Sequence, residues 1–149
     1  MDITELLAFS VKNNASDLHL SSGMPPMIRV DGKIRKIDMP AMEHKQVHAL
    51  LYDIMNDRQR KIYEESFETD FSFEITALSR FRVNVFNQIH GAAGVFRTIP
   101  SKVLTLKELG APELFASIAE LPRGLILVTG PTGSGKSTAI EKLFDLKGI

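Results

Sequence analysis

The sequence predicts an α+β fold with a mainly antiparallel sheet, followed by the start of a second unit of the α/β class. The first part is indicated by the order of its patterns: one helical segment, three strands, one or two helical segments and three more strands. The second part is indicated by a continuous apolar run at residues 125–128 that leads directly into a glycine-rich loop. Such a run is typical of a parallel strand that is buried on both faces.

The composition is that of a globular protein, since 44% of the 149 residues are hydrophobic and 24% are charged. This excludes a disordered chain, a coiled coil and a collagen-like repeat. The 18 basic and 18 acidic side chains balance, so the chain lacks the basic excess of a protein that binds nucleic acid or an anionic membrane. Because the sequence contains no cysteine, disulfides, thiolate metal sites and cysteine nucleophiles are excluded as well.

The sequence also lacks the usual targeting signals. Residues 1–5 do not form the basic region of a signal peptide. No apolar run approaches the roughly 18 residues that a membrane span requires. We therefore expect a cytoplasmic protein with no direct membrane insertion and no nucleic-acid partner.

Three segments of the first part have the apolar spacing of an amphipathic helix, and they are residues 2–13, 43–55 and 58–66. Asp2 or Thr4 is expected to cap the first helix, and Asn56 or Asp57 the third, because their side chains can accept hydrogen bonds from free backbone amides.

Six segments have the pattern of strands, three before the second helix and three after the third: residues 17–21, 27–30, 33–37, 71–75, 81–85 and 95–99. Asp31-Gly32 separates the second strand from the third and is a strong signal for a two-residue hairpin. Residues 91–94 are expected to form the turn that precedes the last strand.

These patterns divide the chain into three parts. Residues 1–99 are expected to form a complete α+β domain, and residues 100–123 a connection with a short helix that starts near Pro112. Residues 124–149 contain a strand, a loop and part of a helix that runs from Lys136.

The most specific motif is the loop between that strand and helix, where residues 130–137 match the pattern G-x-x-x-x-G-K-[ST]. Its glycines allow the backbone to take positive φ and to approach a phosphate, while the helix N-terminus directs partial positive charge at the same point. The lysine would reach the β- and γ-phosphates, and the serine hydroxyl would join the coordination shell of Mg²⁺. The candidate nucleotide-binding residues are Gly130, Pro131, Thr132, Gly133, Ser134, Gly135, Lys136, Ser137 and Thr138, with Ser137 as the magnesium ligand.

Three arginines form a second candidate site. Arg80 and Arg82 alternate with apolar residues, so their side chains leave the same face of one strand. Arg97 lies on the neighbouring strand. Guanidinium groups suit a γ-phosphate on which charge develops during transfer, but a half-exposed sheet also carries arginines on its wet face for solubility alone.

The histidines give a weaker signal. His44 and His48 are four residues apart on a predicted helix, which is the spacing of two metal ligands. Lys45 stands where a zincin motif has its glutamate, and no third ligand is evident. We therefore interpret the pair as part of a solvated helix face and expect no metal site other than the Mg²⁺ that a nucleotide carries.

Several stretches together resemble the type IV pilus retraction ATPases, the PilT-like twitching-motility motors of the type II/IV secretion ATPase superfamily. The stretches that carry this resemblance are residues 15–20, 25–32, 68–73, 80–84, 95–100 and the P-loop. The resemblance implies a PAS-like N-terminal domain, a linker and the start of a RecA-like ATPase domain that binds ATP and Mg²⁺. It implies that Arg82 and Arg97 contact the nucleotide phosphates when the two domains close, with Arg80 less clearly matched.

The resemblance also implies partners and a location. Members of this family form hexameric rings at the cytoplasmic base of the pilus machine, beside the inner membrane, and ATP turnover drives depolymerisation of the pilus. The expected partners are therefore further copies of the same chain and an inner-membrane platform protein of the pilus.

The family pattern ends after Thr138, and the Walker B strand, catalytic glutamate and histidine box of the family are not found among the 149 residues. The sequence thus predicts a truncated or frameshifted form of the motor with weak or no ATPase activity. Two alternatives remain: a non-catalytic PAS-like module that binds motor subunits or the platform protein, and a stand-alone PAS-like sensor. A pilus-extension ATPase is a nearby possibility that the branch-specific stretches disfavour.

Overall fold

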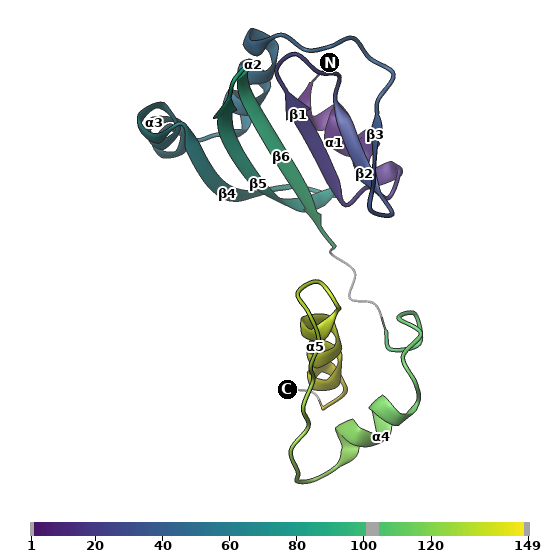
Figure 1. Cartoon of the computed structure of the whole chain (residues 1–149). Coiled ribbons are helices and arrows are strands. Elements are labelled where there is room, and N and C mark those ends of the chain that lie inside the picture. The colour runs from purple at the N-terminus through teal and green to yellow at the C-terminus, as the bar shows by residue number, and fades with distance from the viewer. Residues whose placement is uncertain (1, 101–104, 148–149) are drawn as a thin grey trace. The chain divides into compact units, whose positions relative to one another are not determined.

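The computed structural model describes residues 2–100 and 105–147. The chain divides into two compact units, Met1–Ser101 and Lys102–Ile149 (Figure 1).

The first unit is built on one six-stranded antiparallel sheet, which confirms the predicted α+β class. Its strands are β1 (Asp17–Ser21), β2 (Met27–Val30), β3 (Lys33–Lys36), β4 (Glu68–Ile75), β5 (Ser79–Gln88) and β6 (Gly91–Ile99). Their order across the sheet is β3-β2-β1-β6-β5-β4. The pairing of β1 with β6 therefore joins two three-stranded halves that are separated in the sequence by two helices.

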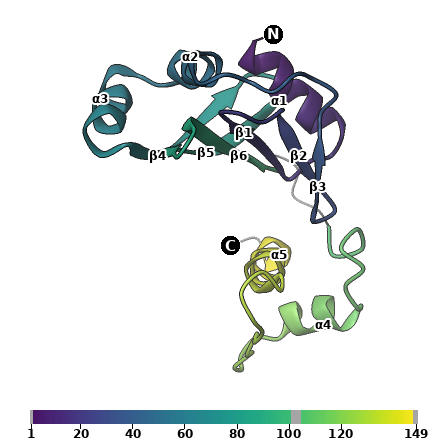
Figure 2. The same ribbon diagram turned by 45° about the horizontal axis from the view of Figure 1, so that its top comes forward.

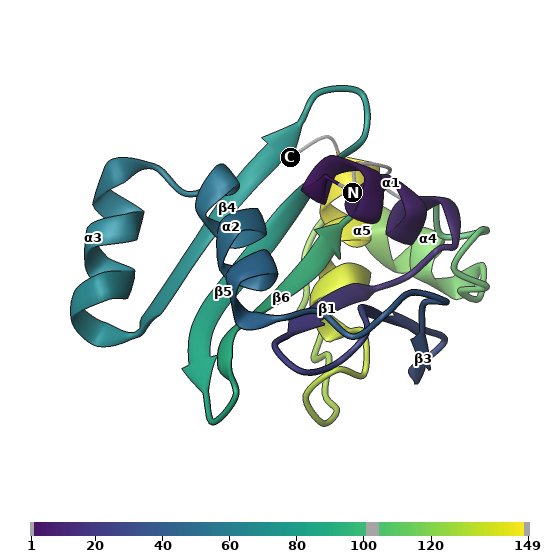
Figure 3. The same ribbon diagram turned by 90° about the horizontal axis from the view of Figure 1, so that it is seen from above.

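Three helices accompany this sheet: α1 (Ile3–Lys12), α2 (His44–Ile54) and α3 (Asp57–Ser66). Helices α1 and α2 cover one face, and α3 lies beside the edge strand β4 (Figures 2 and 3). Asp2 caps α1 and Asn56 caps α3, each within a reciprocal capping box. In both helices the first of the two predicted capping residues is therefore the correct one.

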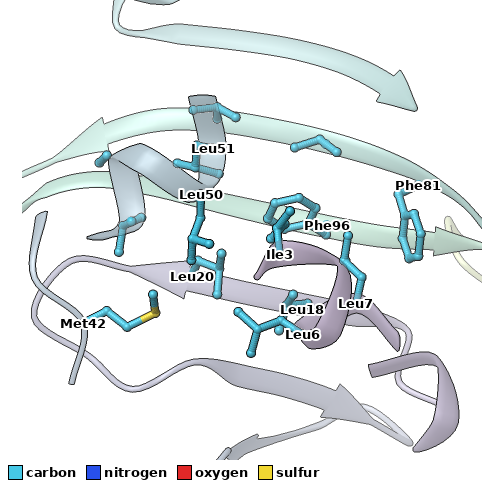
Figure 4. Packing of buried hydrophobic residues seen from close by; sticks show 14 of the residues in the cluster. Ile3, Leu6, Leu7, Leu18, Leu20, Met42, Leu50, Leu51, Phe81 and Phe96 are labelled. Carbon is cyan, nitrogen blue, oxygen red and sulfur yellow. The ribbon is translucent and has the colours of Figure 1, made fainter. Parts of the chain in front are cut away.

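The hydrophobic core lies between the two covering helices and the sheet (Figure 4). Its largest fully buried side chains include Leu6 and Leu7 of α1, Leu51 of α2, and Phe81 and Phe96 of the central strands. Full burial of such a side chain stabilises the fold by about 2 kcal/mol. The first unit therefore has a core of its own.

The two short strands β2 and β3 form the hairpin expected at Asp31-Gly32. Both turn residues have positive φ, 50° at Asp31 and 76° at Gly32, as a two-residue turn of this type requires. All four residues of β3 are exposed, and lysine or arginine occupies three of them. Such charges are typical of a sheet edge that is protected from pairing with another chain.

The turn predicted at residues 91–94 is wrong. These residues belong to β6, and the turn lies at Ile89-His90. The small side chains reflect the packing of a helix, since a Cβ atom on Gly94 would come within 2.6 Å of Leu51 Cδ2 on α2. The close packing of α2 on the sheet therefore explains why residues 91–94 have small side chains, which are also typical of a turn.

The second unit contains two helices in its described residues, α4 (Leu114–Glu120) and α5 (Lys136–Lys147). The strand predicted at residues 125–128 is not present: Leu125 is 84% exposed and Leu127 is 78% exposed. A parallel strand needs neighbours that pair with its backbone and cover its faces. Between residues 105 and 147 no other strand is available to do this.

None of the helices in the described ranges is long and apolar enough to cross a membrane.

Candidate functional site: a glycine-rich loop and an arginine face

The glycine-rich loop of the second unit ends where α5 begins, at Lys136. Gly130, Gly133 and Gly135 have φ of 155°, 81° and 89°, in the range that residues other than glycine rarely adopt. Ala139 N–H donates to the carbonyl of Gly135, so the first turn of the helix follows directly from the loop. Free amides at the start of a helix attract an anion.

The side chain of Lys136 folds back over this loop. Its Nζ atom donates to the carbonyl oxygens of Gly130 at 2.6 Å and Pro131 at 2.7 Å. Ser134 contributes a further contact, because its hydroxyl donates to the Pro131 carbonyl at 2.7 Å. The ammonium group therefore lies over the loop backbone, bound to two neutral acceptors.

The other loop residues are open to solvent. Thr132, Ser137 and Thr138 are exposed, so the hydroxyl of Ser137 is accessible to a cation. A hydroxyl oxygen is a suitable ligand for Mg²⁺. The described conformation thus presents amides, an ammonium group and a hydroxyl, which is the donor set that a Mg²⁺-bound polyphosphate requires.

The arginines lie in the first unit, on the sheet face opposite α1 and α2. Arg82 of β5 and Arg97 of β6 are direct cross-strand partners, so their side chains leave the same face next to each other. Both residues are exposed. Arg80 leaves the same face and forms an ion pair of 3.5 Å with Glu74 of β4.

Each of the central arginines is held by a carboxylate. Arg82 approaches Asp70 through two nitrogens, Nη2 at 3.0 Å and Nε at 3.5 Å. Arg97 donates from Nε to Asp17 Oδ1 at 3.1 Å. The face therefore presents two guanidinium groups whose positions are set by strand register and by anchoring carboxylates.

Asp17 is the most buried of these charged groups, with a side chain that is 7% exposed. Burial alone raises the pKa of this carboxyl, but hydrogen bonds from Ser16 and Arg97 outweigh it, and the pKa lies below its ordinary value. The carboxylate also lies 3.6 Å from Arg29 Nε. Asp17 is therefore ionised at neutral pH and carries one negative charge between two arginines.

His44 and His48 are held by contacts of their own. His44 Nδ1 accepts a hydrogen bond of 3.0 Å from Ala92 N–H, and the His48 ring stacks on Tyr52 with centroids 4.1 Å apart. Burial, together with the nearby His44, lowers the pKa of His48. His44 is exposed but accepts a hydrogen bond from β6, and His48 is half-buried against Tyr52. Both histidines therefore make specific contacts that a purely solvated helix face would not have. Within the described residues no three histidine, aspartate or glutamate side chains are placed to bind a metal.

The structure thus brings the predicted loop residues together in one unit and Arg82 and Arg97 together in the other. Sequence reasoning did not identify Asp17 and Asp70. A signal existed for Asp70, since an acidic residue in an alternating strand suits a neighbouring arginine. None existed for Asp17, because its contact with Arg97 depends on the pairing of β1 with β6.

Comparison with known proteins identifies the class. The family model described as "Type II/IV secretion system protein" matches residues 1–147. The chain belongs to this family.

Within it, the chain is 68% identical over 145 residues to the type IV pilus retraction ATPase PilT of Pseudomonas aeruginosa, which covers 97% of the chain and 42% of that relative. It is 56% identical over 120 residues to a twitching motility protein of Neisseria gonorrhoeae, covering 80% of the chain and 32% of that protein. The chain thus spans less than half the length of these relatives.

Solved structures agree with this assignment. The crystal structure of the pilus retraction motor PilT with bound ADP aligns with a TM-score of 0.81 and 39% identity, covering 97% of this chain and 43% of that one. The Legionella pneumophila ATPase DotB aligns with a TM-score of 0.79 and 24% identity, covering 95% and 41%, and shows the shared fold alone.

Proposed function

We propose that this chain is part of a hexameric, ATP-driven motor that retracts type IV pili in twitching motility. The observation that carries the proposal is the 68% identity to a pilus retraction ATPase along 97% of the chain. The aligned 145 residues include both the arginine face and the glycine-rich loop.

The loop is proposed as the binding site for ATP and Mg²⁺. Residues 130–138 would surround the phosphates, Lys136 would exchange its two carbonyl partners for phosphate oxygens, and Ser137 would bind Mg²⁺. The positive φ of the glycines and the exposed hydroxyl support this assignment. When bound, the cation neutralises charge on the β- and γ-phosphates.

Arg82 and Arg97 are proposed to contact nucleotide phosphates. Their adjacent positions on one sheet face and their exposure support this role. Residues 1–99 are then the PAS-like domain, residues 100–123 the linker and residues 124–149 the start of the RecA-like ATPase domain.

The proposed partners are other copies of the chain in a ring and an inner-membrane platform protein of the pilus machine. The proposed location is the cytoplasmic base of that machine, where the motor is a peripheral protein. The balanced charge of the chain fits protein partners better than nucleic acid.

The direct test of the nucleotide site is a calorimetric titration of the 149-residue chain with ATP and Mg²⁺. We expect saturable binding that a Lys136→Ala variant weakens by at least about tenfold, because the variant removes a charge-assisted contact to phosphate. Lys107→Ala is the matched control, since it removes the same charge from an exposed side chain of the second unit outside the loop. Equal affinity in all three proteins would contradict the proposal.

A second candidate function is that of a non-catalytic interaction module. It is favoured by the contrast between the units, because the first has a buried core while Leu125 and Leu127 of the second are exposed. Mixing the chain with an intact retraction motor tests this candidate. A module that enters the ring lowers the ATPase rate of the motor, whereas a chain that does not associate leaves the rate unchanged.

A further inference from the structure

We infer that Asp17 positions Arg97 for phosphate, whereas Asp70 holds Arg82 back from it. This inference rests on the proposed function, because it assigns separate roles to two carboxylates beside the proposed phosphate-contacting arginines. Asp17 acts through Arg97 and is therefore a positioning residue.

The contact between Asp17 and Arg97 is rigid. Asp17 and Arg97 are direct cross-strand partners in the β1–β6 ladder, so the backbone fixes their spacing. Oδ1 of Asp17 accepts from Arg97 Nε, and Oδ2 accepts from the Ser16 hydroxyl at 2.7 Å. A carboxylate that is 7% exposed and anchored on both oxygens has little freedom to move.

Among the described residues, Arg97 is held at only one nitrogen of its guanidinium group. Asp17 contacts only Nε, and within the described part of the chain the two terminal Nη groups make no hydrogen bond. The side chain of Arg97 is 68% exposed. The end of the guanidinium fork that binds two phosphate oxygens in parallel is therefore oriented and open to solvent.

Arg82 is held in the opposite way. Asp70 approaches both Nε and Nη2, so one side of the fork is already bound to a carboxylate. The side chain of Asp70 is 46% exposed, and a phosphate that approached Arg82 would have to compete with it. Asp70 thus lowers the affinity of Arg82 for an anion.

Local charge supports the distinction. Asp17 is shared by Arg29 and Arg97, which leaves one net positive charge on this cluster. Arg82 and Asp70 form a one-to-one pair with no net charge. An anion is therefore attracted to Arg97 more strongly than to Arg82.

The test uses two variants with the same change in charge, Asp17→Asn and Asp70→Asn, in the full chain. The probe is inorganic triphosphate, and the readout is the NMR signal of the Arg97 Nε–Hε group, identified by its loss in Arg97→Lys. We expect Asp17→Asn to weaken binding at Arg97 by about tenfold, because it removes the charged partner that orients the fork. We expect Asp70→Asn to strengthen it about threefold, because it removes a neighbouring negative charge and frees Arg82.

Simple electrostatics predicts that both variants strengthen anion binding, since each removes one negative charge. A stronger affinity in both variants therefore overturns the inference. Amide spectra establish whether the Asp17→Asn variant is folded. If it is not, Asp17→Glu takes its place: it keeps the charge but moves the carboxylate by one methylene, and wild-type affinity in that variant also overturns the inference.

The outcome separates this inference from the proposed function. A wild-type chain that binds ATP and Mg²⁺ but shows no change at the Arg97 signal with triphosphate overturns the proposed roles of Asp17 and Arg97 and leaves the nucleotide site of the loop unaffected. A chain that binds neither ligand overturns both.

Discussion

Leu51 of α2 lies directly against Gly94 of β6, where a Cβ atom on residue 94 would come within 2.6 Å of Leu51 Cδ2. Leu51 is fully buried, and Gly94 pairs with Leu20 on one side and Val85 on the other. The helix can approach the centre of the sheet because this position lacks a side chain. The absence of a side chain at residue 94 therefore allows α2 and β6 to pack closely at this point.

Gly94→Ala is expected to destabilise the first unit by about 1–3 kcal/mol, because a methyl group overpacks the core at this contact. Leu51→Ala alone creates a cavity and costs about 2–5 kcal/mol. The double variant should be more stable than the sum of the two changes implies, since the alanine at 51 makes room for the new methyl group. Urea unfolding measures all three, and strictly additive effects would contradict the proposed contact.

The order of elements in the first unit follows from local patterns, and the structure confirms it. The error at residues 91–94 has a physical cause: small residues favour a turn when only neighbours in the sequence are considered. Their function in β6 depends on α2, which is far away in the sequence and packs over them. Sequence patterns identified the elements but not the packing between them.

The candidate site shows the same limit. The loop at residues 130–137 is a local motif, so a single stretch of sequence defines it. The alternation that places Arg80 and Arg82 on one face is local as well. The anchor of Arg97 is not, because Asp17 is 80 residues away and meets it only through a strand pairing that no short-range pattern predicts.

Phe67 provides a second prediction, since it ends α3 with a left-handed φ of 57° although its side chain is large. Phe67 is 59% exposed, so its side chain gains little from burial. Phe67→Asn should raise the free energy of unfolding by about 0.5–1 kcal/mol, because asparagine adopts this conformation with less strain.

Thermal and urea unfolding measure this effect. Phe9→Asn is a suitable control, because Phe9 is 43% exposed and lies within α1, where asparagine is a poorer helix former. That variant should lose stability. A loss of similar size in Phe67→Asn would indicate that the ring contributes more by packing than the backbone loses by strain.

The third prediction concerns pH and His48. Burial and the nearby His44 lower the pKa of His48 in the folded state, so the unfolded chain binds the proton more readily. The neutral form therefore stabilises the fold fully above the ordinary histidine pKa of about 6.5, and this stability is lost as the pH falls through the lower folded value. His19, whose pKa is also lowered by burial, adds to the effect in the same direction.

Urea midpoints at about pH 7.5 and about pH 5.5 measure this dependence. His48→Gln removes one of the two histidines whose pKa is lowered, so the difference between the two urea midpoints should become smaller. His19 accounts for the difference that remains. A His48→Gln protein with the full wild-type dependence would assign the effect to other groups.

The last prediction concerns the glycines of the loop. Gly133 and Gly135 have φ of 81° and 89°, and a Cβ atom on either would meet no other atom within 4 Å. An alanine at these positions is therefore opposed by backbone strain alone, which amounts to about 1 kcal/mol per residue. If the loop binds phosphate in the described conformation, Gly133→Ala and Gly135→Ala should each weaken the binding of ATP and Mg²⁺ by about fivefold.

Gly110 is the matched control, since its φ is 67° and its Cβ position is equally open, but it lies outside the loop. Calorimetry should find wild-type affinity in Gly110→Ala, and a similar loss in all three variants would trace the effect to the stability of the second unit instead of the shape of the loop.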